Sequence, residues 1–161
     1  MGFFTKLFAR TDAPDALTSA FASQSEQRLS LLLIPAVVRM AHCDKDSTEE
    51  TNALIKAALT MKAFADRAYQ KADSGFDIAI LISAAFISAR RSDPKTAMAS
   101  LTHDLSFEDR KVAIHLALKG ALLSPKREIW DIGFLSGLAR LLDLNDAEFE
   151  TIFDRVRQEI R

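Results

Sequence analysis

Four acidic side chains lie within seven residues of one another at a predicted turn between two helices: Asp44, Asp46, Glu49 and Glu50. Carboxylate oxygens are the ligands that hard cations such as calcium and magnesium prefer, so this group could converge on one divalent cation. The ligand spacing and the glycine of an EF-hand loop are missing. Helix capping is the alternative, because Ser47 and Glu50 have capping-box spacing and acids are favoured at the positive end of a helix.

This stretch has a degraded copy 80 residues further along the chain, where Ser124 stands at the position of Asp44. The apolar positions of the two copies agree far better than their turns do. The matching pairs include Val38 with Leu118, Leu54 with Phe134, Ile55 with Leu135 and Phe64 with Leu144. This sequence repeat predicts two related helical hairpins that form an internal pseudo-twofold repeat.

Composition limits the classes of protein that the chain can belong to. With 161 residues and 48% hydrophobic content, residues 1–161 can bury one core, which predicts a single domain. The net charge of −1 provides no global field for nucleic acid. A single cysteine, Cys43, rules out an internal disulfide and suggests a reducing compartment, so we expect a cytoplasmic protein. The longest apolar runs, 29–38 and 78–89, are too short for a transmembrane segment.

The chain is expected to be all-α. It has only five glycines and four prolines, and no segment alternates apolar and polar residues as a strand would. The periodicity and the capping residues predict a compact bundle of about seven to eight helices. The expected helical segments span 15–23, 25–43, 47 to about 60 or 64, 74–90, 94–103, 106–123, 124–142 and 145 or 146–160, and residues 66–71 begin or continue a short helix.

The first residues, 1–12, form an amphipathic N-terminal segment. Phe3, Phe4, Leu7 and Phe8 make one apolar stripe, and Lys6 lies off it. Such a stripe suits a membrane surface or a groove on the protein itself, and we expect it to pack on the protein.

No catalytic motif is present. The chain has no nucleophile elbow, phosphate-binding glycine loop or dinucleotide fingerprint, and no two histidines have the spacing that lets them share a zinc on one helix. Lys126 and Arg127 are expected in the first turn of a helix, against the dipole preference, with Trp130 close by. These three residues are candidates for binding a partner, and burial of Trp130 in the core is the alternative.

Five segments of the chain share the motifs of a known family: residues 2–6, 37–41, the acidic turn 44–50, the second turn at 123–131, and the closing segment 141–149. In these segments the chain resembles the TerB family of tellurite-resistance proteins. The resemblance implies a compact all-α fold with an internal pseudo-twofold repeat. It also implies divalent-cation binding, because each turn of that family usually carries an Asp-Gly pair followed by a carboxylate.

This sequence departs from that pattern in both turns. The first keeps Asp44 and Glu49 but has Lys45 where glycine is usual. The second has Ser124 and Pro125 in place of the Asp-Gly pair, and its only acids are Glu128 and Asp131. The expected site is therefore an incomplete one, for calcium or magnesium.

The resemblance favours a non-enzymatic cytoplasmic protein of tellurite or chemical-stress resistance. Such a protein would bind a protein partner, in a membrane-associated resistance complex, and it could form oligomers. Two alternatives stay open. One is a small metal-dependent enzyme or hydrolase, with Asp44 and Glu49 as acid and base between the hairpins. The other is a co-chaperone-like helical interaction domain, because TerB-like domains also occur attached to J-domains.

Overall fold

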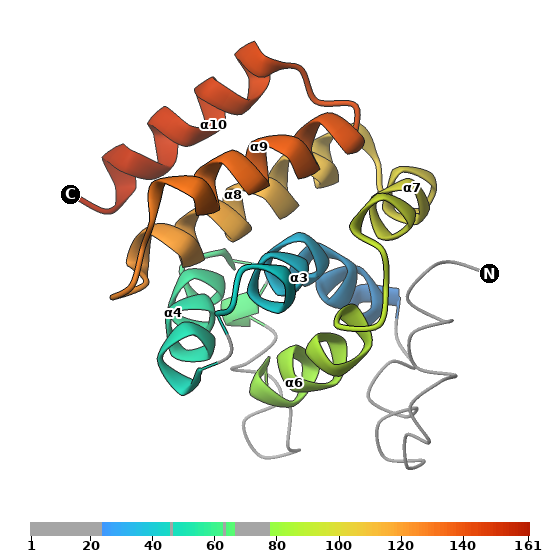
Figure 1. Cartoon of the computed structure of the whole chain (residues 1–161), viewed down its shortest axis with the longest axis horizontal. Helices are drawn as coiled ribbons and strands as arrows, with labels where there is room; N and C mark the ends of the chain where they lie inside the picture. The colour runs from blue at the N-terminus through green and yellow to red at the C-terminus, as the bar shows by residue number, and fades with distance from the viewer. Residues whose placement is uncertain (1–23, 46, 63, 67–77) are drawn as a thin grey trace.

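The computed structural model describes residues 24–45, 47–62, 64–66 and 78–161, and this part of the chain is helical without strands (Figure 1). The all-α expectation is thereby confirmed. Seven helices are bounded in the described residues: α3 (Gln24–His42), α4 (Thr48–Leu59), α6 (Ile78–Ala89), α7 (Pro94–Asp104), α8 (Phe107–Leu123), α9 (Ile129–Leu141) and α10 (Asp146–Glu159). In the same residues, no helix is both long and apolar enough to cross a membrane.

Some expectations fall on residues that are not described. They are the amphipathic segment 1–12, the helix expected at 15–23, most of the one at 66–71 and the first residues of the one at 74–90. The acidic residue Asp46 also lies outside the described residues.

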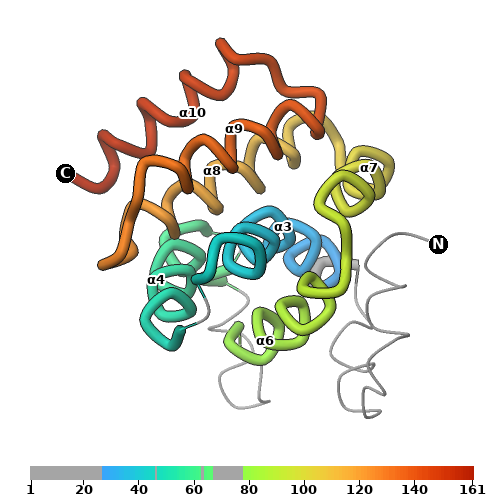
Figure 2. Tube along the Cα trace, viewed as in Figure 1, coloured from blue at the N-terminus to red at the C-terminus, as the bar shows by residue number. Residues whose placement is uncertain are grey.

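Helix α3 lies at the centre of the fold (Figure 2). It packs between α6 and α8, and α4 packs on α8 as well. Helices α8, α9 and α10 contact one another and form one side of the molecule. The core that these helices share contains fully buried side chains from distant parts of the chain, among them Leu32, Leu54, Ile82, Leu116 and Leu135.

Four helices begin with a side-chain cap, and three of the capping residues, Ser47, Ser106 and Asn145, stand where the sequence predicts a helix start. The side chains of Ser47, Asp93, Ser106 and Asn145 each accept a hydrogen bond from a backbone N–H in the first turn of the following helix. Those amides have no partner within the helix, so each cap satisfies one of them. At α10 the cap is reciprocal, because Glu148 also accepts the backbone N–H of Asn145 at 2.8 Å.

The start of α9 differs from the prediction. We expect a helix from Ser124, but Ser124 has extended backbone angles and α9 begins at Ile129. The hydroxyl of Ser124 accepts the N–H of Lys126 at 3.1 Å, which closes a turn instead of a first helical turn. Lys126 and Arg127 therefore lie in the α8–α9 turn. The sequence predicts them at a helix N-terminus instead, and this prediction is wrong.

The structure does not confirm the 80-residue repeat. Asp44, at the end of α3, has a left-handed backbone with φ 53°, whereas Ser124 has φ −65°. The turn that matches Asp44 follows α9, where Asp143 has φ 60°. After α3 the backbone N–H of Lys45 donates to the carbonyl of Met40 at 3.1 Å. After α9 the backbone N–H of Leu144 donates to the carbonyl of Ala139 at 2.9 Å. This is the Schellman ending, so α3–α4 and α9–α10 are the hairpins with similar turns.

Gly120 marks a close approach of α8 to α4. A Cβ atom at this position would lie 3.2 Å from Cδ1 of Leu54, whereas one at Gly137 on α9 would meet nothing within 4 Å. We expect Gly137→Ala to raise the free energy of unfolding by about 1 kcal/mol, because alanine favours a helix over glycine. Gly120→Val should lower it by about 1–3 kcal/mol through overpacking. Urea denaturation of both variants tests this, and an unchanged Gly120→Val midpoint would contradict the close packing.

Candidate functional site

A network of buried charged side chains joins α3, α4 and α9. Arg39 of α3 pairs with Glu50 of α4 at 2.8 Å through Nη2, and with Asp131 of α9 at 3.3 Å through Nη1. Lys45, in the turn after α3, lies 3.3 Å from the other oxygen of Asp131. All four residues are at most 5% exposed. We call these four residues the buried ion network.

The buried ion network also anchors the α8–α9 turn. Nζ of Lys45 donates to the backbone carbonyl of Lys126 at 2.7 Å. The hydroxyl of Ser124 donates to Oε1 of Glu50. Lys45 further lies 5.5 Å from the ring centroid of Trp130, a cation–π arrangement. Lys45 therefore holds the backbone of the second turn, and Glu50 holds the Ser124 side chain of the same turn.

Two cations and two anions balance in this network. Each buried charge is expensive to desolvate, and the loss is offset only when opposite charges and hydrogen bonds surround it. Most polar atoms of the network have such partners, but Nε of Arg39 is buried without one among the described residues. The guanidinium is therefore bound through its two terminal nitrogens, which reach in two directions.

The predicted cation ligands of the first turn separate into two environments. Asp44 and Glu49 are exposed, and Asp46 is not described. Glu50 points inward, where Arg39 and Ser124 occupy its two carboxylate oxygens. At α4 only the Ser47 half of the expected capping box is found, and the Glu50 carboxylate is instead the buried counter-ion of a cation eleven residues earlier.

The two acids of the second turn have structural partners as well. Oδ2 of Asp131 accepts the backbone N–H of Glu128 at 3.2 Å, so Asp131 closes the start of α9 while it pairs with Arg39 and Lys45. The Glu128 side chain is 47% exposed and lies 3.7 Å from Lys45. Across the described residues, no group of three or more His, Cys, Asp or Glu side chains could hold a metal ion.

Cys43 lies next to this network as a buried, free thiol. Burial, together with the negative charge of Asp131, raises the pKa of Cys43 to about 11. The thiolate is the reactive form, so a pKa of this height describes an inert thiol at neutral pH. The burial and the raised pKa of Cys43 are those of a structural cysteine.

The outer surface of the α8–α9 turn is apolar and basic at once. Ile129 is 90% exposed and Trp130 is 49% exposed. Lys126 and Arg127 are exposed beside them. We call these four residues the turn surface. Three of them are predicted from the sequence; Ile129 is missed, because an isoleucine at the start of a helix gives no sign of its exposure.

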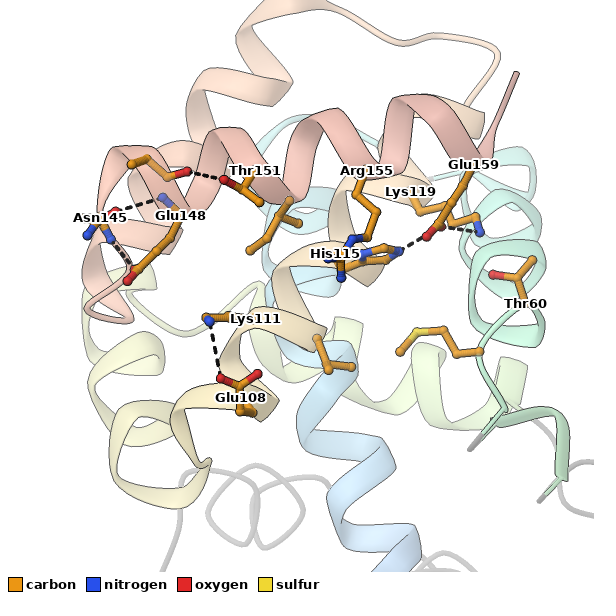
Figure 3. Close-up of a pocket in the computed structure, with 14 residues that line it drawn as sticks. Thr60, Glu108, Lys111, His115, Lys119, Asn145, Glu148, Thr151, Arg155 and Glu159 are labelled. Atoms are coloured by element: carbon orange, nitrogen blue, oxygen red, sulfur yellow. Dashed lines mark hydrogen bonds and ion pairs between the residues drawn. The ribbon is translucent and has the colours of Figure 1, made fainter.

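A groove of about 690 Å³ lies between α8 and α10 (Figure 3). In it, Oε2 of Glu159 lies 2.9 Å from both Nζ of Lys119 and Nε2 of His115. Burial raises the pKa of Glu159, but the hydrogen bonds with Lys119 and His115 outweigh that effect, so the net pKa is lowered. Glu159 therefore remains an ionised acceptor at neutral pH.

The enzyme alternative needs a carboxyl group with a raised pKa near a cavity. Among the described residues, the other carboxyl group with a shifted pKa is Asp109, and the pKa of Asp109 is lowered too, chiefly by the hydrogen bond from Arg28 at 2.7 Å. Neither Asp44 nor Glu49 lines the groove between α8 and α10. The proposed acid and base of a hydrolase are thus exposed side chains away from this groove.

Replacing Arg39 should reveal how much the fold depends on the buried ion network. Arg39→Met leaves Glu50 and Asp131 buried with fewer counter-charges, so we expect the free energy of unfolding to fall by about 3–5 kcal/mol. Arg140→Met is the matched control, because Arg140 pairs with Asp146 on the surface, where both side chains are more than half exposed. Urea denaturation should show no measurable loss for the control, and a similarly small loss for Arg39→Met would contradict the network's role.

The thiol of Cys43 should resist alkylation in the folded protein. With a pKa of about 11, about one thiol in a thousand is ionised at pH 8, and burial blocks the reagent as well. We expect iodoacetamide to label Cys43 only at the rate of unfolding, as followed by mass spectrometry. Asn52→Cys in a Cys43→Ser background provides the exposed comparison on α4 and should react far faster. Equal rates would refute the inert thiol.

Comparison with known proteins identifies no relative of this chain: no protein-family model matches it, and neither do curated proteins or solved structures. The proposals that follow therefore rest on the residues and their geometry.

Proposed function

We propose that this chain is a non-enzymatic, TerB-like interaction module that binds a protein partner through the turn surface. The observation that carries the proposal is Ile129, a large apolar side chain that is 90% exposed beside the half-exposed Trp130. Exposed apolar side chains that occur singly are common on protein surfaces. Here, two lie next to each other in the first turn of one helix, with two cations adjacent.

The turn surface has the composition of a binding hot spot. Tryptophan and arginine are the residues that most often dominate binding energy, and Lys126 and Arg127 supply a basic rim around the apolar pair. The partner that complements this surface is an acidic protein segment that carries an apolar side chain.

The backbone beneath the turn surface supports the proposal, because it is held before any partner arrives. Lys45 binds the carbonyl of Lys126, and Ser124 binds Glu50. A surface that is already ordered loses less conformational entropy on binding than a free loop does. From the TerB resemblance we add that the partner belongs to a membrane-associated complex of tellurite or chemical-stress resistance, and that the protein acts in the cytoplasm.

A photo-crosslinking amino acid at position 129 tests the turn surface in the cells from which the chain comes. We expect a discrete crosslinked protein from position 129 and none from position 150, an exposed residue of α10. Trp130→Ala should weaken binding of the identified partner by about 2 kcal/mol or more, as hot-spot truncations do, measured by calorimetry with the purified proteins.

Ile129→Ser separates loss of binding from loss of folding, because a side chain that is 90% exposed contributes little to the core. This variant should melt at the wild-type temperature and bind weakly. Wild-type affinity in Ile129→Ser, or equal crosslinking from positions 129 and 150, would contradict the proposal. For the stress-resistance part, cells without the gene should lose tellurite tolerance, and Ile129→Ser should not restore it. Unchanged tolerance would reject that part alone.

A further inference from the structure

Three arginines meet around a second, smaller pocket of about 280 Å³ at the end of α10. Arg127 comes from the α8–α9 turn, and Arg157 and Arg161 come from the last residues of the chain. The other three lining residues, Leu122, Phe153 and Ile160, are apolar, and we call them the apolar floor. None of these six described lining residues is acidic. We call this site the arginine pocket.

The three guanidinium groups have no carboxylate partner in the described part of the chain. Arg127 donates to the backbone carbonyl of Leu122 at 3.5 Å, and Arg157 lies over the ring of Phe153 at 5.6 Å. Other arginines of this protein, such as Arg28 and Arg39, do pair with carboxylates. The arginine pocket therefore concentrates positive charge that no side chain neutralises.

The negative ends of two helices offset only part of the positive charge of the arginine pocket. The C-termini of α8 and α10 both lie at the pocket, and each carries a partial charge of about −0.5 that attracts cations. Together they offset about one of the three positive charges. The excess stays positive even when a terminal carboxylate on Arg161 is counted, so the pocket favours an anion.

The larger groove between α8 and α10 lacks such an excess. Its lining includes three acids, Glu108, Glu148 and Glu159, against the cations Lys111, Lys119 and Arg155. Glu159 alone already binds Lys119 and His115 (Figure 3). An unmatched positive charge is thus a property of the arginine pocket and not of every hollow on this protein.

We propose that Arg127, Arg157 and Arg161 bind a phosphate monoester group carried on an apolar or aromatic stem. The planar fork of arginine matches phosphate oxygens with paired hydrogen bonds. The floor of Leu122, Phe153 and Ile160 receives the stem. The pocket is slightly smaller than the usual range for ligand sites, about 300–1,000 Å³, which suits a single group better than a nucleotide. This inference goes beyond the interaction module and stands without it, because Arg157 and Arg161 lie outside the turn surface.

The test is an amide NMR titration of the full chain with phenyl phosphate and with inorganic phosphate at constant ionic strength. We expect shifts confined to residues around 122–127 and 153–161, and tighter binding of phenyl phosphate than of inorganic phosphate, because only the former fills the apolar floor. Arg157→Ala and Arg161→Ala should each weaken binding by about tenfold, the value of one hydrogen bond to a charged group.

Arg155→Ala is the matched control, because it removes the same charge from the same helix but faces the groove toward α8. It should leave phosphate binding unchanged. Arg157→Lys keeps the charge without the fork and should show an intermediate loss. Equal weakening by Arg155→Ala, or shifts scattered over the surface, would reduce the effect to non-specific attraction and overturn the proposal. Neither result would bear on binding through Ile129.

Two sources can supply this phosphate group: a free phosphate ester and a phosphorylated side chain of a protein. A short phosphotyrosine peptide, titrated beside phenyl phosphate, distinguishes them. Tighter binding of the peptide assigns the site to a protein side chain, and equal binding assigns it to a free ester. Absence of binding by both probes at millimolar concentration overturns the proposal.

Discussion

The guanidinium of Arg39 holds together three helices that are distant in the sequence. It binds Glu50 with one terminal nitrogen and Asp131 with the other, so α4 and α9 are both positioned against α3. The energy of a charge pair in a low-dielectric interior depends strongly on distance. A small displacement of any of these helices would therefore leave a buried charge without its partner. The packing of α8 follows, because the same carboxylates fix the turn through which α8 leads into α9.

This arrangement joins the interior to the surface. Glu50 binds Ser124, and Lys45 binds the backbone at Lys126, so the residues just beyond them project from a fixed backbone. Ile129 and Trp130 are exposed on the outer side of the turn, whereas Asp131, the next residue, is buried in the ion network. The buried ion pairs and the exposed apolar side chains therefore belong to the same short segment.

The sequence predicts the helices well where local chemistry determines them. Ser47, Ser106 and Asn145 cap the helices as expected, since a cap depends only on residues three positions away. The prediction that a helix starts at Ser124 is wrong. The Ser124 hydroxyl accepts a hydrogen bond within a turn and donates one to the distant carboxylate of Glu50. The pairing of Glu50 with Arg39 and Asp131 is also beyond a local pattern, although Arg39 within an apolar stretch is a signal that a buried counter-ion must exist. Arg127 and Arg157 meet only because α8 and α10 pack together.

Neutrality of the buried ion network restricts how this protein can evolve. Arg39 pairs with two carboxylates, and Asp131 pairs with two cations. Each ion pair of the network therefore shares a residue with another pair. Replacing one charged residue by a neutral one leaves a net charge of one in the interior. Reversing the sign of one residue leaves a net charge of two. A route from this network to an apolar core therefore passes through intermediates that are less stable than either end. The four positions are therefore coupled electrostatically, so the residue at one position limits which residues the other three tolerate, even where side chains of equal volume would fill the same space.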